Sequence, residues 1–229
     1  MSSAAIVFEE RVRVPANICN LQEFRRWAHS DAFPETGRVS YLAGEVDIDM
    51  SPEELTTHNQ AKTDVTGDLR VLVRRHGLGN VFSDGALLVN EAADLSTEPD
   101  AMFCSVESYQ SGRVKYVERR EGSRRYIEVN GAPDLVIEVV SRTSVHKDTE
   151  LLPSLYFAAG IAEYWIIDAR RDELVFRVLT RGWEQFVETE VDSEGYRTSR
   201  VLARCFRLVR EPSPAGGYWY TLLDRESSI

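Results

Sequence analysis

The segment Asp134–Val140 constrains the fold of this chain more than any other. Its sequence, Asp-Leu-Val-Ile-Glu-Val-Val, is almost continuously apolar, which is typical of a strand buried on both faces of a sheet. A charged group inside such a strand is strongly destabilising unless it is paired, protonated or bound to a metal. Glu138, in the middle of the run, is therefore either a structural acid, protonated or paired with an arginine, or part of a functional site.

The residues after this strand predict a crossover to a parallel neighbour. Residues 149–159 are expected to form a helix that ends at Gly160, since Pro153 is tolerated in a first turn and glycine often follows a helix. Residues 163–168 form a second apolar run, and residues 174–179 its hairpin partner. A strand, a helix and a strand in succession predict a βαβ unit, so we expect an α/β fold with a mixed central sheet flanked by helices.

An N-terminal helix and a hairpin are expected before this core. Asn20, with Glu23 three residues later, forms a capping-box pattern that predicts the start of a short helix. Residues 39–42 and 45–50 flank Ala43-Gly44, and the second run alternates apolar and acidic residues as a half-exposed strand would. We interpret both elements as an elaboration of the core.

A longer helix is predicted after the hairpin. Ser51-Pro52-Glu53-Glu54 is a helix-start signal, and Gly77 and Gly79 mark the end. Residues at steps of three and four form one face of this helix: His58, Ala61, Val65, Leu69, Leu72 and His76. Two strands are then expected at residues 86–89 and 101–104.

Length and charge limit the class of protein. The 229 residues contain no linker rich in proline, glycine or serine, so we expect one domain over residues 1–229, with a core at about 38–180 and peripheral strands and a terminal segment at 181–229. The net charge is −10, which repels a polyanion at long range and counts against nonspecific DNA binding of high affinity. Acidic residues that a metal later neutralises would still be compatible with a nuclease.

Residues 105–130 are the least patterned part of the chain and carry most of its clustered positive charge. They are expected to form a hairpin with one basic face, made of Arg113, Lys115, Arg119, Arg120, Arg124 and Arg125. Such a face is either a solvated charged surface or a surface that contacts phosphates, and the sequence leaves both open.

The cysteines and the apolar runs indicate the compartment. Cys19, Cys104 and Cys205 lack the paired spacing of a metal or redox motif and are expected to be reduced thiols. Residues 1–11 do not resemble a signal peptide, and no apolar run approaches the roughly 18 residues of a membrane span. We therefore expect a cytoplasmic protein that does not bind membranes.

A second acid stands at the start of another predicted strand. Asp100 follows Pro99 there and, taken alone, is equally compatible with a turn residue. If Asp100 and Glu138 meet at adjacent strand ends, they form an oxygen-rich site of the kind that Mg²⁺ prefers. Such a metal would activate water and stabilise charge on a phosphodiester.

Several strings occur in an order that resembles a known family. They are Gly44-Glu45, Met50-Ser51-Pro52 with His58, Glu98-Pro99-Asp100, the block Gly131–Ser141, then Asp148, Tyr156, Gly160 and Glu163–Asp168. Over roughly residues 20–210 the chain is similar to the Uma-type family of restriction endonucleases, a branch of the PD-(D/E)XK nuclease superfamily. The block from Gly131 to Asp168 is the specific part of the resemblance.

The resemblance implies a restriction-endonuclease-like core and a metal-dependent endonuclease that acts on DNA. By that match Asp100 and Glu138 bind Mg²⁺ or Mn²⁺, with the backbone carbonyl of Val139 completing the set. Glu45 and His58 fall on family positions and are expected to line the site, although His58 is also compatible with a buried core histidine. Cutting both DNA strands needs two sites, so the function favours a homodimer.

The chain departs from the family pattern at its lysine. The superfamily has a lysine two residues after the glutamate, where this chain has Val140, and Uma-type proteins usually carry it on the following helix, where Leu151 and Leu152 stand. Lys147 is the nearest replacement in sequence. Lys62 is the other candidate, unless it is a solvated helix residue.

The departure leaves two functional alternatives. Asp148 either lines the site or caps the helix that begins near Thr149. Because the loss of a charge-stabilising group lowers rates by orders of magnitude, the alternative to an active enzyme is a catalytically degenerate member that binds nucleic acid or protein.

Overall fold

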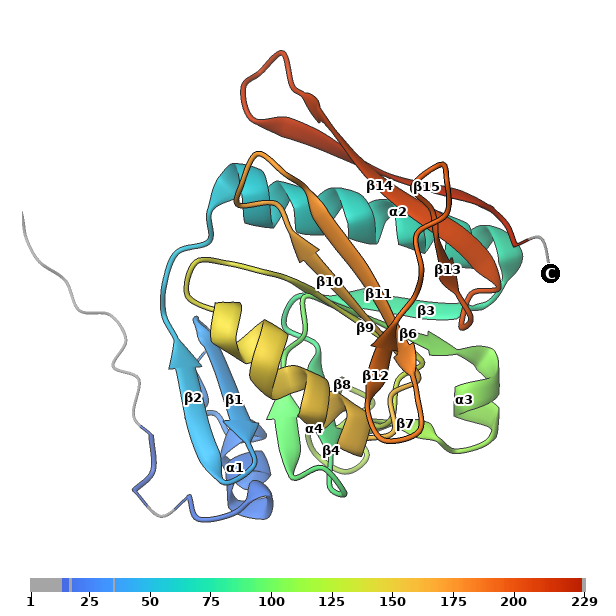
Figure 1. Cartoon of the computed structure of the whole chain (residues 1–229). Helices are drawn as coiled ribbons and strands as arrows, with labels where there is room; N and C mark the ends of the chain where they lie inside the picture. The colour runs from blue at the N-terminus through green and yellow to red at the C-terminus, as the bar shows by residue number, and fades with distance from the viewer. Residues whose placement is uncertain (1–13, 17, 35, 228–229) are drawn as a thin grey trace, which may run out of the picture.

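The strand that contains Glu138 is β9 (Leu135–Val139), an inner strand of a six-stranded sheet in the computed structural model (Figure 1). The model describes residues 14–16, 18–34 and 36–227. Residues 1–11, on which the expectation of no signal peptide was based, lie outside these ranges. The order β12-β11-β10-β9-β6-β3 is formed by Phe186–Glu188, Val175–Arg181, Glu163–Asp168, Leu135–Val139, Ala101–Ser105 and Gly79–Ser83.

The predicted crossover connects β9 to β10. The chain leaves β9, passes through a π-helical turn, η2 (Lys147–Leu151), and helix α4 (Leu152–Ala158), and returns as β10. β9 and β10 are parallel, with Leu135 opposite Glu163, whereas the other pairs of this sheet are antiparallel. The expected mixed sheet and α/β fold are therefore confirmed.

A second six-stranded sheet carries the N-terminal elements. Its order is β2-β1-β5-β4-β8-β7, formed by Glu45–Asp49, Arg38–Leu42, Leu95–Thr97, Leu87–Asn90, Tyr126–Gly131 and Val114–Glu118. The expected hairpin is confirmed as β1–β2. Helix α1 (Leu21–Ala28) packs on this sheet through Phe24 and Trp27, and the side chain of its N-cap Asn20 accepts from the Glu23 amide. Strands β3 and β5 and the short helix α3 (Val106–Gln110) were not predicted.

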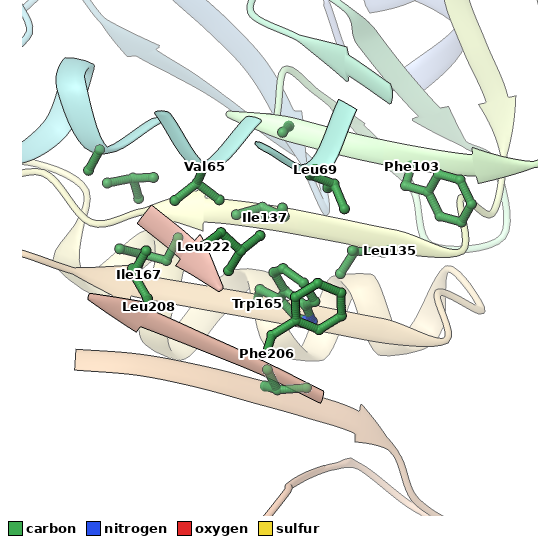
Figure 2. Packing of buried hydrophobic residues seen from close by; sticks show 14 of the residues in the cluster. Val65, Leu69, Phe103, Leu135, Ile137, Trp165, Ile167, Phe206, Leu208 and Leu222 are labelled. Atoms are coloured by element: carbon green, nitrogen blue, oxygen red, sulfur yellow. The ribbon is translucent and has the colours of Figure 1, made fainter. Parts of the chain in front are cut away.

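The long helix α2 (Gln60–His76) covers one face of the first sheet (Figure 1). It follows a π-helical turn, η1 (Leu55–Asn59), and ends at Gly77, whose φ of +63° favours glycine. The predicted apolar face is buried: Val65 and Leu69 pack against Ile137 of β9 and its neighbours (Figure 2).

The C-terminal residues form a third sheet, β13 (Arg197–Ser199), β14 (Arg204–Pro212) and β15 (Tyr218–Glu226). The backbone amides of Tyr220 and Leu222 donate to Asp64 and Asp68 of α2. The rings of Phe206 and Trp165 lie 4.9 Å apart in the cluster shown in Figure 2. Phe206, Leu208 and Leu222, which belong to the segment expected at the periphery, thus contribute to the main core.

The opposite face of the first sheet packs against α4 and the second sheet. Leu152 and Tyr156 of α4 are buried there with Val136 and Ile166, whose side chains alternate with those that face α2. Glu138 has the same parity as Val136, so its side chain projects toward α4. Among the described residues, no helix has the length and apolar character needed to cross a membrane.

Candidate functional site

The two acids singled out in the sequence lie next to each other. Antiparallel pairing of β6 and β9 places Ala101 opposite Ile137, so Asp100, at the start of β6, is beside Glu138. The amide of Asp100 donates to Oε2 of Glu138 at 3.3 Å, and the amide of Val139 donates to Oδ2 of Asp100 at 2.7 Å. Both carboxylates are buried, with residues 3% and 4% exposed. Sheet register therefore builds a two-carboxylate site.

The two acids differ in their charge state. Burial alone would raise the pKa of Asp100, but the neighbouring His58 and Arg38 side chains and the Val139 amide lower it below its usual value. Burial, and then the charge of Asp100, raise the pKa of Glu138 well above its usual value. The surroundings therefore favour the ionised form of Asp100 and the protonated form of Glu138.

Three cationic or potentially cationic side chains surround Asp100. Nη2 of Arg38 lies 3.3 Å and Nζ of Lys62 lies 3.9 Å from Oδ1, while Nε2 of His58 lies 3.5 Å from Oδ2. Arg38 comes from the start of β1, His58 from η1 and Lys62 from α2. The N-terminal hairpin that the sequence analysis treated as an elaboration thus forms a wall of the site.

Glu53 connects these three side chains. Its Oε1 accepts from Arg38 and, at 2.6 Å, from Lys62, and its Oε2 lies 3.6 Å from Nδ1 of His58 and accepts from Asn59 at 2.8 Å. Burial would raise the pKa of Glu53, but these hydrogen bonds and charges outweigh it and lower the pKa to about 2. The sequence analysis used Glu53 only as a helix-start signal and missed this position.

Lys62 is not the solvated helix residue that was one interpretation of the sequence. Its side chain is 3% exposed, and Nζ donates to Glu53 at 2.6 Å and to Asp84 at 2.8 Å. An ammonium group has three donors. Two of them bind Glu53 and Asp84, and Asp100 lies 3.9 Å from the same nitrogen. That interpretation is therefore wrong, because the fold surrounds the amine with acids.

Lys147 lies near Glu138 without a direct ion pair. It begins η2, and among the described residues no carboxylate oxygen is within 4.0 Å of its amine. Burial would lower the pKa of Lys147, but the charges of Glu138 and then Asp148 raise it overall. Lys147 therefore contributes positive potential at Glu138 from a distance.

Asp148 does not cap the helix. It lies inside η2, whose N-cap is His146, and it is 1% exposed. Its Oδ2 accepts from the Ser144 hydroxyl, and its Oδ1 has no hydrogen-bond partner in the described part of the chain. Burial raises the pKa of Asp148 to about 6. The capping interpretation is wrong because the helical turn begins one residue earlier, at Lys147.

A cavity of about 650 Å³ opens beside Asp100. Its lining residues come from the β1–β2 hairpin, the segment before α2, the β3–β4 turn, the β5–β6 loop and the loop after β9: Gly37, Arg38, Asp49, Ser51, Pro52, Glu53, Glu54, His58, Asp84, Gly85, Glu98, Ser141, Arg142 and Thr143. Hydroxyl contacts close one side, where Thr143 donates to Asp49 and lies 3.3 Å from Ser51. A polar ligand that enters here reaches Arg38 and His58.

Glu45, which was expected to line the site, lies elsewhere. Glu45 is exposed and pairs with Leu42 at the end of the β1–β2 hairpin that is remote from Arg38. It does not line the cavity beside Asp100. The role that the resemblance implied for Glu45 stays a prediction without a structural contact.

The basic segment forms the predicted hairpin, β7–β8, and half of its charge is paired. Arg113 binds Asp134, and Arg119 and Arg120 bind Asp31. Lys115, Arg124 and Arg125 make no ion pair with a described residue, and no residue of 105–130 lines the cavity. Phosphate contact by this face also stays a prediction.

The donor set fits a hard divalent cation only in part. Among the described residues, no three histidine, cysteine or acidic side chains form a preassembled metal cage. Mg²⁺, however, usually binds one or two carboxylates and fills its remaining positions with water and substrate oxygens. Each carboxylate oxygen also has more than one lone pair, so Asp100 and Glu138 retain capacity, and the raised pKa of Glu138 indicates negative charge that a cation would relieve.

Comparisons with known proteins agree with the class that the fold defines. The chain has a nuclease-like α/β fold: it matches the crystal structure of "a putative nuclease belonging to DUF820" from Anabaena variabilis with a TM-score of 0.58 and 18% identity, over 80% of this chain and 90% of the other. The family model Uma2, described as "Putative restriction endonuclease", matches residues 21–205. The chain belongs to the Uma2 family. No curated protein matches it.

Proposed function

We propose that this protein is an endonuclease that hydrolyses DNA phosphodiester bonds with Mg²⁺ or Mn²⁺. Family membership supports a nuclease. The observation that carries the finer proposal is the contact of Asp100 with Glu138, two buried acids from different strands that share one site. A structural pair of acids would be expected to bind an arginine each, whereas Glu138 binds no cation among the described residues.

Asp100 and Glu138 would hold the cation, which would supply an activated water and positive charge for the phosphodiester. The chain's own groups fix these ligands: the Val139 amide orients Asp100, and the Tyr156 hydroxyl, 2.6 Å from Oε1, orients Glu138. We propose that the backbone carbonyl of Val139 would be a third ligand of the cation. Lys147 would add positive potential beside Glu138, in place of the lysine that Val140 replaces.

DNA is the proposed partner despite the net charge of −10. The unpaired cations of the β7–β8 hairpin, Lys115, Arg124 and Arg125, are the proposed contacts to its backbone. Double-strand cleavage needs two active sites, which favours a homodimer.

Calorimetric titration with Mg²⁺ and Mn²⁺ tests the metal site. The wild type is expected to bind a divalent cation, and Asp100→Ala and Glu138→Ala are each expected to lose that binding. Glu128→Ala is the matched control, because Glu128 is also buried but is paired with Arg25 and His29. Unaltered cation binding in both site variants would exclude the site.

A second candidate function has one observation in its favour. The two positions at which the family pattern has a lysine are occupied here by Val140 and by leucines, and Val140 and Leu152 are buried in the apolar core. The alternative is a catalytically degenerate protein that binds nucleic acid or protein. A plasmid-nicking assay over several divalent metals separates the two, since cleavage that Glu138→Ala abolishes would reject degeneracy.

A further inference from the structure

Of the side chains around Asp100, Arg38 and His58 line the cavity, and Arg38 is the one of the two that is always charged. It is the first residue of β1, where side chains of even number face Thr97 and Asp100: Ser40 lies 3.0 Å from the Thr97 hydroxyl. Val39 and Tyr41, of the other parity, are buried against α1. Strand periodicity therefore directs Arg38 toward Asp100.

Among the described residues, the acids contact only one nitrogen of the Arg38 guanidinium. Nη2 contacts Glu53 and Asp100, whereas Nε and Nη1 donate to no acceptor in the described ranges. The side chain is 23% exposed and lines the cavity of about 650 Å³. The free N–H groups of Nε and Nη1 point to different sides of the guanidinium, and each is suited to donate a charge-assisted hydrogen bond to one phosphate oxygen.

The other cations near the acids are less suited to that task. Lys62 is 3% exposed, does not line the cavity, and is held by Glu53 and Asp84. Lys147 does not line the cavity either. Arg142 lines it but forms no ion pair with a described acid, whereas Arg38 lies 3.3 Å from Asp100.

We propose that Arg38 binds a nonbridging oxygen of the DNA phosphate in this site and supplies the positive charge that Val140 cannot. The inference rests on the proposed nuclease function. Glu53 is then a positioning residue, because it holds Nη2 while Nε and Nη1 of this cavity-lining arginine keep their N–H donors free. Because Arg38 lines the cavity and lies beside Asp100, its positive charge would stabilise a phosphate that enters the cavity.

The first test measures binding, not cleavage. A short labelled DNA duplex is titrated with protein in Ca²⁺, at several salt concentrations, and fluorescence anisotropy is recorded. Arg38→Met is expected to weaken binding about tenfold and to reduce the slope of log K against log salt by about one, as for one lost phosphate contact. Arg38→Lys is expected to keep the slope and to recover only part of the affinity, because an ammonium lacks the separate, fixed nitrogens that contact Glu53 and the phosphate at once.

Two further variants control for the loss of any arginine and for misfolding of Arg38→Met. Arg204→Met is the control for the loss of one partly exposed arginine, because Arg204 of β14 pairs with Asp224 of β15, outside the site. It should bind DNA as the wild type does. If Arg38→Met fails to fold, the double variant Arg38→Met/Glu53→Gln, which removes one charge of each sign, is measured instead and should show the same loss of affinity and slope.

The outcomes separate this inference from the nuclease proposal. Wild-type affinity and slope in Arg38→Met would overturn the role of Arg38, whatever the cleavage assay shows. Arg38-dependent binding by a protein that cleaves no DNA with any metal would support the phosphate contact and reject the nuclease. A wild type that neither binds nor cleaves duplex DNA would overturn both.

Discussion

The Tyr156 hydroxyl donates a 2.6 Å hydrogen bond to Oε1 of Glu138, and both side chains are buried. Tyr156 belongs to α4 and Glu138 to β9, so the crossover helix fixes the orientation of a proposed metal ligand. Groups that orient a ligand in this way usually change metal affinity by about 10–100-fold when removed.

Tyr156→Phe is therefore expected to lower Mg²⁺ affinity about tenfold and the free energy of unfolding by about 1 kcal/mol. Tyr164→Phe is the control: Tyr164 is equally buried, but its hydroxyl donates to the backbone carbonyl of Asp148 at 2.8 Å. It should lose similar stability and keep its Mg²⁺ affinity. Equal affinities in the two variants, measured by calorimetry, would show that Tyr156 is only a core residue.

Glu138→Gln is expected to stabilise the metal-free protein. Because the pKa of Glu138 is raised in the native state, the native protein keeps a proton that the unfolded chain loses near 4.5. The resulting stability is present below that pH and is lost as pH rises through the native pKa. The variant has no such loss, so its melting temperature at mildly alkaline pH should exceed that of the wild type.

Glu128→Gln is the matched control for this experiment. Glu128 is buried, but Arg25 donates to it at 2.6 Å and His29 lies at 2.9 Å. The substitution should lower the melting temperature, because Arg25 and His29 lose the opposite charge and one of the two acceptor oxygens, which an NH2 donor replaces. A lower melting temperature in both variants, recorded by calorimetry without metal, would contradict the assignment of Glu138 as an uncompensated acid.

Glu53→Gln is expected to weaken stability at neutral pH and to flatten its acid dependence. The pKa of Glu53 is about 2, against 4.5 in the unfolded chain. Its stabilising contribution is therefore present above about 4.5 and is lost as pH falls toward about 2. Urea unfolding at several pH values measures the slope. Glu173→Gln, at an exposed position, is the control and should keep the wild-type slope. The same slope in both variants would contradict the claim that the site lowers the pKa of Glu53.

Phe206→Ala is expected to cost about 3–5 kcal/mol of unfolding free energy, as large truncations in a core do. Phe206 is fully buried against Trp165, although it belongs to the C-terminal sheet. Trp219→Ala, on the same sheet but 52% exposed, is the control and should cost little.

We also expect one cooperative urea transition if residues 181–229 and the rest form a single domain. Two transitions, with only one shifted by the substitution, would contradict that expectation.

Local sequence determined most of the secondary structure around the site. The buried strand with Glu138 and the crossover to β10 followed from apolar runs and turn residues, because burial on both faces requires such composition. The start of α1 after Asn20 followed from capping chemistry, and the end of α2 at Gly77 followed from the preference of glycine for a positive φ. Strands β3 and β5 were missed because they are short and lack a clear alternating pattern.

The sequence by itself determined that Glu138 would be buried and that its charge had to be paired, neutralised by a proton or bound to a metal. The identity of its neighbours was decided by tertiary structure, because antiparallel pairing of β6 with β9 brings Asp100 beside it. Arg38 and Glu53 belong to segments whose patterns predict only a strand and a helix start. They became part of the site because the second sheet and the loop before α2 close over Asp100, and contacts of that range leave no periodic trace in a sequence.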